Sequence, residues 1–211
     1  MTAAERLFAR QGIEGTSLRE ISAAAGLSNN SSVQYHFGSK ETLLENLFFH
    51  RMMQMENRRE QMLESARKNG LAGDMRTLME IICLPHLDVV DGDGRHSYAE
   101  FLSQYLLRYR PPAGLLADPP EPPAPLQLAA VQRLIREQLS DLPEEVVMRR
   151  LVISVLGFLA VLINHKSFIV RGGKGRRLDI ALADTMDQIT IAMSLPFRDV
   201  AIAMPATTAQ P

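Results

Sequence analysis

Residues 16–44 read TSLREISAAAGLSNNSSVQYHFGSKETLL, and this stretch decides the fold of the N-terminal part of the chain. Ser17 and Glu20 have the Ser-x-x-Glu spacing of a capping box, which marks a helix start. The apolar positions that follow at helical spacing are Leu18, Ile21 and Ala25. Gly26 stands where a tight turn needs a left-handed residue. The stretch therefore predicts two short helices joined by a turn, the pattern of a helix-turn-helix.

Further helices flank this turn on both sides. Thr2 and Glu5 have the spacing of another capping box and predict a first helix that ends at Gly12. The helix after the turn is predicted from Ser28 to His36, and Ser39 is predicted to cap a long fourth helix. The apolar positions of that fourth helix recur every three or four residues and are Leu43, Leu44, Leu47, Phe48, Met52 and Met55.

The rest of the chain predicts a second helical unit. Helical patterns cover residues 74–87, 97–109, 126–142, 144–168 and 178–193. Residues 110–125 hold seven of the twelve prolines, which predicts an exposed, partly extended loop. The expected fold class is all-α, because long alternating strand patterns are absent. We expect a three-helix DNA-binding domain over residues 1–48, a helical effector-binding and dimerisation domain over 49–196, and a disordered tail over 197–211.

Composition sets limits on the class of protein. The chain has 211 residues, 46% of them hydrophobic and 22% charged, with a net charge of −1. Its first 50 residues hold four basic and five acidic side chains, which also gives −1. Electrostatics therefore provides no argument for nucleic-acid binding, and the case has to rest on motif and geometry. Cys83 is the single cysteine and the N-terminus has no apolar leader, so a cytoplasmic, nucleoid-associated protein is expected.

Four N-terminal segments together resemble a known family signature. In order they are residues 8–12 (FARQG), 16–21 (TSLREI), 25–28 (AGLS) and 35–44 (YHFGSKETLL). They resemble the TetR family of bacterial regulators over about the first 50 residues. The resemblance implies a homodimer that binds double-stranded operator DNA and responds to a small molecule, with repression as the usual mode. The effector, the operator and the target genes, and whether the protein represses or activates, are not written in the sequence.

The predicted DNA-binding residues lie in and around the helix-turn-helix. A recognition helix places its N-terminal residues near base edges. Here these are the short hydrogen-bonding side chains Ser28, Asn29, Asn30, Ser31 and Ser32, with Gln34 and Tyr35 one turn further on. Serine and asparagine also favour helix starts, so Ser28 is expected to act as a cap. The resemblance implies further contacts, chiefly to phosphates, from Thr16, Ser17, Arg19, Tyr35, His36 and Lys40.

One departure from the family pattern affects these assignments. Between Leu27 and Phe37 the chain has one residue more than is usual, and Gln34 stands where a tyrosine is common. The register of individual base contacts within residues 29–35 is therefore open by one position.

The resemblance places an effector pocket and a dimer interface in the second unit. An apolar small molecule is the expected effector, with pocket residues Met79, Cys83, Phe101, Tyr105, Phe158 and His165. The same spacing also fits simple core packing. The last two helices are expected to form a four-helix dimer interface, because residues 151–163 are apolar nearly all round. The interface residues predicted from them are Val155, Leu159, Leu162, Leu182, Met186 and Ile189.

Other classes of protein fit the sequence less well. Residues 86–96 hold two histidines and three aspartates, but their spacing fits neither a zinc motif nor a calcium loop, so a solvated connection is expected. No catalytic, metal or cofactor motif is present, and we expect neither an enzyme nor a cofactor. The apolar run 151–163 has 13 residues, fewer than the roughly 18–20 that cross a bilayer, so a buried core helix is expected. A helical adaptor without DNA binding and an activator remain alternatives.

Overall fold

The computed structural model describes residues 1–29, 31–109, 125–165 and 177–200. Within these ranges the chain is helical and holds no strand, which confirms the all-α prediction. Ten α-helices and one 3₁₀ helix, η1, follow one another. Their bounds are α1 Thr2–Gln11, α2 Leu18–Ala24, α3 Ser32–Phe37, α4 Lys40–Gln54, α5 Glu56–Lys68, α6 Met75–Cys83, η1 Leu84–Asp88, α7 Ser97–Arg108, α8 Leu126–Gln138, α9 Glu144–Asn164 and α10 Leu178–Ser194.

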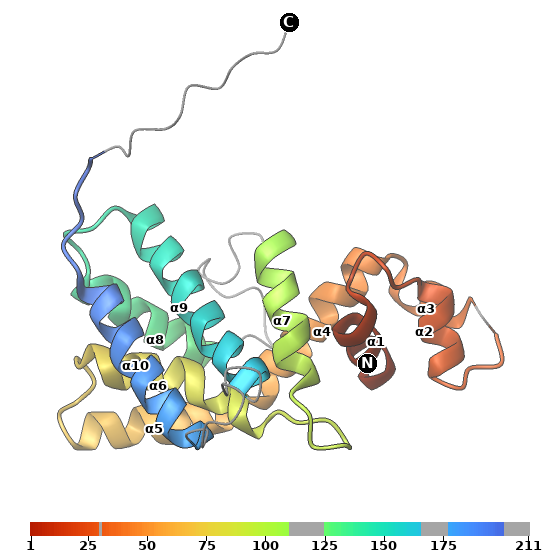
Figure 1. The fold of residues 1–211 in the computed structure, drawn as a ribbon, viewed down its shortest axis with the longest axis horizontal. Coiled ribbons are helices and arrows are strands. Elements are labelled where there is room, and N and C mark those ends of the chain that lie inside the picture. The colour runs from red at the N-terminus through yellow and green to blue at the C-terminus, as the bar shows by residue number, and fades with distance from the viewer. Residues whose placement is uncertain (30, 110–124, 166–176, 201–211) are drawn as a thin grey trace, which may run out of the picture.

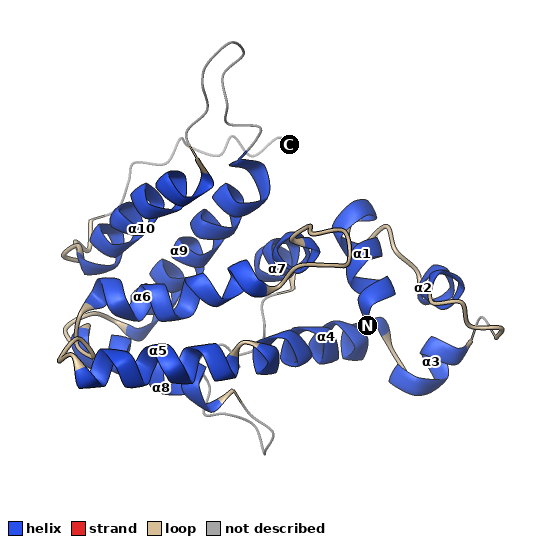
Figure 2. Cartoon of the chain, turned by 90° about the horizontal axis from the view of Figure 1, so that it is seen from below, coloured by secondary structure: helices blue, strands red, loops and turns tan. Residues whose placement is uncertain are grey.

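The helices form two groups that are joined by α4 (Figure 1). α1, α2 and α3 lie together at one end, and α5 to α10 form a larger bundle at the other. α4 runs from the small group toward α5, and the two helices follow nearly the same line (Figure 2). α7 packs against both α9 and α1, and the buried side chains form one continuous cluster from Ala4 to Met193. The predicted domain boundary at residue 48 falls inside α4, and the division into domains stays a prediction.

Two of the predicted helix caps are confirmed. The hydroxyl of Ser17 accepts a hydrogen bond from the N–H of Glu20 at 3.2 Å, and the Glu20 carboxylate accepts one from the N–H of Ser17 at 2.8 Å. The bond from the N–H of Ser17, and then the bond that the Ser17 hydroxyl donates to the same carboxylate at 2.7 Å, lower the pKa of Glu20. Ser39 caps α4 by accepting from the N–H of Thr42 at 3.1 Å. Each of these caps involves residues only three positions apart, so the backbone of the helix start is enough to form the predicted hydrogen bonds.

The capping box predicted at Thr2 is wrong. Met1 is the N-cap residue of α1, and no side chain caps this helix. Glu5 is fully buried instead of turning back to the helix start. Its partners come from α4 and α7, far away in the sequence, so the Thr-x-x-Glu spacing was coincidental here.

The helix after the turn starts later than predicted. α3 begins at Ser32, not at Ser28, and its N-cap residue Ser31 forms no side-chain cap. The side chain of Asn29 accepts a hydrogen bond from the N–H of Ser31 at 2.9 Å, which stabilises a turn in place of the first helical turn. Asparagine and serine side chains compete with helical backbone bonds in this way. The polar run therefore forms a loop that leads into a six-residue helix.

The second group follows the predicted order with shifted ends. The pattern at 74–87 is α6 followed by η1, and those at 97–109, 126–142 and 178–193 are α7, α8 and α10. α5 was not predicted, because most of its side chains are polar and it follows α4 after a break at Met55. The proline-rich loop at 110–125, the end of the helix predicted over 144–168 and the tail beyond residue 200 lie wholly or almost wholly outside the described residues.

α9 is longer than the apolar run that indicated it. It has 21 residues, and an 18-residue window within it has a mean hydropathy of 2.3. By length and composition alone it could cross a membrane, so the argument that the run was too short is wrong. One such helix is weak evidence, since core helices pass the same test; 44% of the window is buried, and α9 packs against α6, α7 and α10.

Candidate DNA-binding surface, latch and cavity

A buried serine joins the two helices of the helix-turn-helix. The Ser22 hydroxyl donates to the carbonyl of Leu18 at 3.1 Å and accepts from the N–H of Val33 on α3 at 3.4 Å. Val33 is buried, and Gly26 has the positive φ, 69°, that the turn requires. Sequence reasoning missed Ser22, because a serine in an alanine-rich helix gives no sign of a partner eleven residues away. The bond fixes α3 against α2.

Most of the predicted DNA-binding side chains lie on the surface of this unit. Ser32 and Lys40 are half-buried, and the exposed members are Ser17, Arg19, Ser28, Asn29, Ser31, Gln34, Tyr35 and His36. Tyr35 is 94% exposed, although a tyrosine ring carries a large apolar area. Such a ring is available for contact with a partner molecule.

The two cations of this surface have different surroundings. The ammonium of Lys40 lies 3.5 Å from the carbonyl oxygen of Glu14, and Arg19 extends from α2 into solvent. Neither side chain forms an ion pair with a described residue. Both charges are therefore free to meet a phosphate.

The structure corrects one of the predicted DNA contacts and does not describe another. Thr16 is buried, and its hydroxyl donates to the carbonyl of Gly12 at 2.8 Å, so its side chain stabilises the bend after α1 and is not available to a phosphate. That assignment is corrected in favour of the exposed Ser17. Asn30 lies outside the described residues.

A buried carboxylate connects α1 to the larger bundle. The Arg51 guanidinium of α4 binds Glu5 through two hydrogen bonds, Nε to Oε2 at 2.6 Å and Nη2 to Oε1 at 2.9 Å. The Ser97 hydroxyl, at the start of α7, donates to the same Oε1 at 2.6 Å. Paired, charge-assisted bonds of this kind are among the stronger polar contacts in proteins. Glu5 therefore ties together α1, α4 and α7.

A glutamine on α7 adds a second connection to α1. Gln104 accepts a hydrogen bond from the N–H of Ile13 at 3.1 Å and donates to the carbonyl of Phe8 at 3.1 Å. Phe8 also packs against Phe101 of α7, with ring centroids 5.8 Å apart. We call the polar group Glu5, Arg51, Ser97 and Gln104 the latch. Nothing local in the sequence pointed to these four residues.

The loop before α7 and the end of α7 also contact the small group. Asp91 is buried, in contrast to the solvated loop predicted at 86–96, and its carboxylate lies 3.6 Å from the Nε of Arg6. The backbone N–H of Arg95, which donates to Asp91, is the main reason that the pKa of Asp91 is lowered. At the other end of α7, the Tyr109 hydroxyl donates to Glu14. α7 is thus held along its length by the DNA-binding unit.

Comparison with known proteins supports the reading of this unit. Residues 1–47 match the family model of bacterial regulatory proteins of the tetR family. The N-terminal unit is a TetR-type DNA-binding domain. The match covers α1 to α3 and the first half of α4, and it supports a DNA-binding transcriptional regulator with a helix-turn-helix. No curated protein and no solved structure matches the chain.

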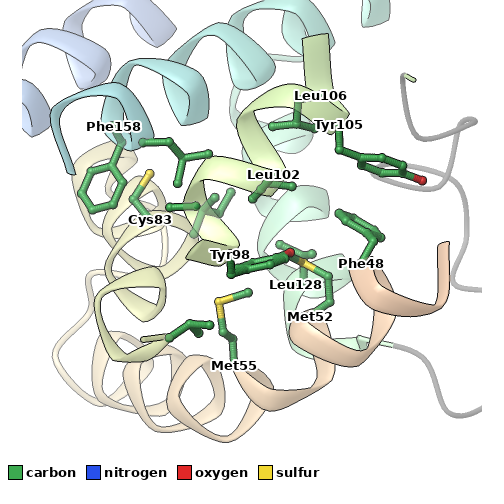
Figure 3. Close-up of a cluster of buried hydrophobic side chains, with 14 of the residues drawn as sticks. Phe48, Met52, Met55, Cys83, Tyr98, Leu102, Tyr105, Leu106, Leu128 and Phe158 are labelled. Atoms are coloured by element: carbon green, nitrogen blue, oxygen red, sulfur yellow. The ribbon is translucent and has the colours of Figure 1, made fainter. Parts of the chain in front are cut away.

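The larger bundle and α4 together line a small cavity. Its volume is about 30 Å³. The lining side chains come from α4 to α9 with η1, and they are Phe48, Met52, Arg59, Ile82, His86, Leu102, Leu106, Leu128, Gln132, Met148, Leu151, Val152 and Val155. Figure 3 shows Phe48 and Met52 of α4 facing Leu102 of α7, with Leu128 of α8 nearby. All lining side chains except Arg59, His86 and Gln132 are apolar.

Two of the polar lining groups are deeply buried and incompletely bonded. Nη1 of Arg59 donates to the carbonyl of Met52 at 3.2 Å and to Glu56 Oε1 at 3.1 Å. Nε of Arg59 and both ring nitrogens of His86 have no hydrogen-bond partner among the described residues. Burial, with the positive charge of Arg59 as a smaller cause, lowers the pKa of His86 to about 3. The imidazole is therefore neutral at physiological pH.

The residues predicted for an effector pocket are not those that line this cavity. Met79, Phe101 and Phe158 are completely buried in the core. Cys83 and Tyr105 are also buried, while His165 is half-buried at the end of α9. None of the six is among the lining residues. Methionine and aromatic residues at helical spacing here fill the core, which was the alternative interpretation.

The predicted dimer residues also need correction. Val155 is half-buried and lines the cavity, and the other five are buried within the single chain: Leu159, Leu162, Leu182, Met186 and Ile189. They belong to the packing of α9 against α10 or α6 and are not free for a second subunit. The apolar side chains that stay exposed on these helices are different ones, among them Ile153 (60%) and Ile191 (63%).

Proposed function

We propose that the chain is a ligand-responsive repressor that binds a two-fold symmetric operator as a homodimer and leaves it when a small molecule enters the cavity. One observation carries most weight: the cavity and the latch share two helices. α4 and α7 line the cavity through Phe48, Met52, Leu102 and Leu106. The same two helices hold α1 through Arg51, Ser97 and Gln104.

A ligand would act by separating these helices. A cavity of about 30 Å³ holds no more than about two or three water molecules, whereas pockets for drug-sized ligands measure roughly 300–1,000 Å³. Binding therefore requires the cavity to widen, and we expect α4 and α7 to move apart as it does. Arg51 directly precedes the buried Met52 in α4, so a shift of Met52 moves the guanidinium that holds Glu5. The helix-turn-helix would then change its position relative to the bundle.

Dimerisation is proposed through the outer faces of α9 and α10. Ile153 on α9 and the three residues Ile180, Ile191 and Leu195 on or after α10 are exposed. Exposed large apolar side chains on neighbouring helices mark an interaction surface. A second copy is the expected occupant, because two recognition helices must meet successive major grooves about 34–36 Å apart, and a two-fold axis supplies that arrangement.

The roles proposed on the DNA follow from side-chain chemistry. Lys40, a point charge, suits phosphate, and Ser17 and Arg19 offer donors beside it. Gln34 carries an amide that can form two hydrogen bonds with an adenine edge. Tyr35 and His36 are exposed on the same short helix and would pack against the sugar-phosphate backbone. Ser28, Asn29, Ser31 and Ser32 precede or open α3 and would approach the groove edge.

A binding assay separates these roles. The DNA upstream of the protein's own gene serves as operator, a scrambled duplex of equal length as control, and fluorescence anisotropy as readout. Lys40→Ala is expected to weaken binding to both duplexes equally. Gln34→Ala is expected to cost about 1–3 kcal/mol on the operator and little on the scrambled duplex. If Gln34→Ala leaves the ratio of the two affinities unchanged, sequence is read elsewhere.

Sedimentation tests the oligomer. We expect two chains per particle, and two chains per operator duplex in a titration. Ile153→Glu places a charge on the proposed interface and is expected to give folded monomers that have lost operator binding. Leu71→Glu, an equally drastic change at an exposed leucine between α5 and α6, serves as the control and should stay dimeric. A wild-type monomer at micromolar concentration contradicts the proposal.

A further inference from the structure

Arg59 occupies an unusual position for a cation. It is 1% exposed and lies beside a cavity whose other lining is mainly apolar. Nη1 has oxygen acceptors, but Nη2 has only the sulfur atoms of Met52 and Met55, at 4.0 and 3.7 Å. Sulfur is a weak acceptor. A buried cation with one unbonded nitrogen and one weakly bonded nitrogen is costly, and buried polar groups are normally satisfied.

Among the described residues Glu56 is the one carboxylate paired with Arg59, and it is shared with another positive group. Glu56 Oε1 binds Nη1 of Arg59, but Oε2 also accepts from the N–H of Gln127 at 2.6 Å, and Oε1 from the N–H of Leu128 at 3.3 Å. These two N–H groups form the N-terminus of α8, which carries about half a positive charge. One carboxylate therefore faces roughly one and a half positive charges, so the site has an unmet need for an anion.

His86 adds a directional group at the same cavity. Its ring is almost fully buried and neutral, and it forms part of the cavity lining with both nitrogens unbonded. A neutral imidazole offers one N–H donor and one acceptor. No described carboxylate or carbonyl takes that N–H. Arg59 and His86 together present donors to a cavity that holds no protein acceptor for them.

We propose that the effector is a monocarboxylic acid with an apolar body, whose carboxylate binds Arg59 and His86. This inference rests on the proposed function, since it names the ligand class of that cavity. The apolar body would lie among the remaining lining residues. Met52 and Met148 have flexible side chains that can make room. The carboxylate completes the bonding of Arg59, so opening of the cavity is compensated by polar contacts that the empty protein lacks.

Calorimetric titration of the full-length protein tests the charge requirement without any variant. The probes are octanoate and 4-phenylbutanoate, each paired with its primary amide, together with octylamine. We expect each acid to bind at least tenfold tighter than its amide, and octylamine not to bind. Equal or tighter binding of the amides overturns the proposal, as does the absence of binding by both acids at millimolar concentration.

Variants locate the carboxylate. Arg59→Met is expected to reduce the preference for acid over amide to near one, while Arg67→Met, an exposed arginine on the same helix, keeps it. An Arg59→Met protein that still prefers the acid tenfold overturns the assignment. Operator release is measured separately by anisotropy. Acids that bind through Arg59 but leave operator affinity unchanged contradict ligand-released repression and leave the carboxylate site standing.

Discussion

Arg51 and Arg59 lie only eight positions apart, the first mostly buried and the second fully buried, and their surroundings differ. Arg51, in the latch, binds Glu5 through two bonds and the Gln54 side chain through a third, so each of its nitrogens has an oxygen acceptor. Arg59, at the cavity, has an unbonded Nε and an Nη2 with only sulfur partners. Satisfied buried charges make a rigid joint, whereas an unsatisfied one is ready for an additional partner. The difference predicts that Arg51 holds the fold and is consistent with the proposed ligand-binding role of Arg59.

The largest effect is expected from breaking the satisfied pair. Glu5→Ala removes three hydrogen bonds and leaves the mostly buried Arg51 without its counter-charge. Loss of one partner of a buried ion pair costs about 3–5 kcal/mol in the free energy of unfolding. Urea denaturation measures this. Glu45→Ala, an exposed carboxylate on α4, is the control and should stay within about 0.5 kcal/mol. A cost below about 1 kcal/mol for Glu5→Ala would show that the latch is not a structural joint.

Acid provides a second way to sharpen the comparison, because the folded protein keeps His86, on the cavity side, from taking up a proton. Burial holds the pKa of His86 near 3, below its ordinary value of 6.5, so between these values only the unfolded chain binds the proton. Stability therefore falls as the pH drops below 6.5. From pH 6.5 to 5 the loss attributable to His86 is about 2 kcal/mol.

The measurement is the free energy of unfolding of the wild type and His86→Leu at several pH values. The variant lacks the titrating group, so its stability should fall less over this range. Parallel pH profiles for the two proteins would mean that His86 is protonated readily in the folded chain. That result would remove the neutral imidazole from the description of the cavity.

Local features of the fold were predictable from the sequence, and contacts between distant segments were not. The caps at Ser17 and Ser39 involve neighbours three residues away, so spacing alone identifies them. The same spacing misled at Thr2, because Glu5 is taken by Arg51, 46 positions further along the chain. The start of α3 was missed since the Asn29 side chain competes with the helix for a backbone N–H.

The site showed the same limit. The helix-turn-helix could be located because a family signature covers it, and the register of individual base contacts within residues 29–35 stays open by one position. The cavity could not be identified from the sequence. Helical spacing places Phe101 and Phe158 on apolar helix faces, but it does not show whether they face a cavity or the core. α9 is apolar on nearly all sides, and only packing decides that Leu159 faces inward and Ile153 outward. Arg59 gave no signal, because an arginine in a polar helix is usually on the surface.

A smaller effect is expected at the second connection of the latch. Gln104→Ala leaves the N–H of Ile13 and the carbonyl of Phe8 without these partners, at a cost of about 1–2 kcal/mol. Ser103→Ala, whose hydroxyl bonds only within α7, is the matched control and should change stability by less than about 0.5 kcal/mol. Thermal unfolding of both variants gives the comparison. Equal stabilities would confine the latch to Glu5 and its two partners.

The smallest effect on stability is expected from removing the unsatisfied arginine. In Arg59→Met, Glu56 keeps its bonds from the start of α8, and the carbonyl of Met52 keeps the N–H of Met55 at 3.2 Å. Few polar groups therefore lose their hydrogen-bond partners, and an apolar side chain of similar length fills the space among the methionines. The free energy of unfolding is therefore expected within about 1 kcal/mol of the wild type, in either direction. Arg59→Lys keeps a buried charge that cannot reproduce the planar fork, so it should be the less stable of the two variants. Urea denaturation of both, beside Glu5→Ala, completes the comparison. A loss for Arg59→Met as large as that for Glu5→Ala would show that Arg59 holds the fold as Arg51 does, and that its free nitrogen is no sign of a binding role.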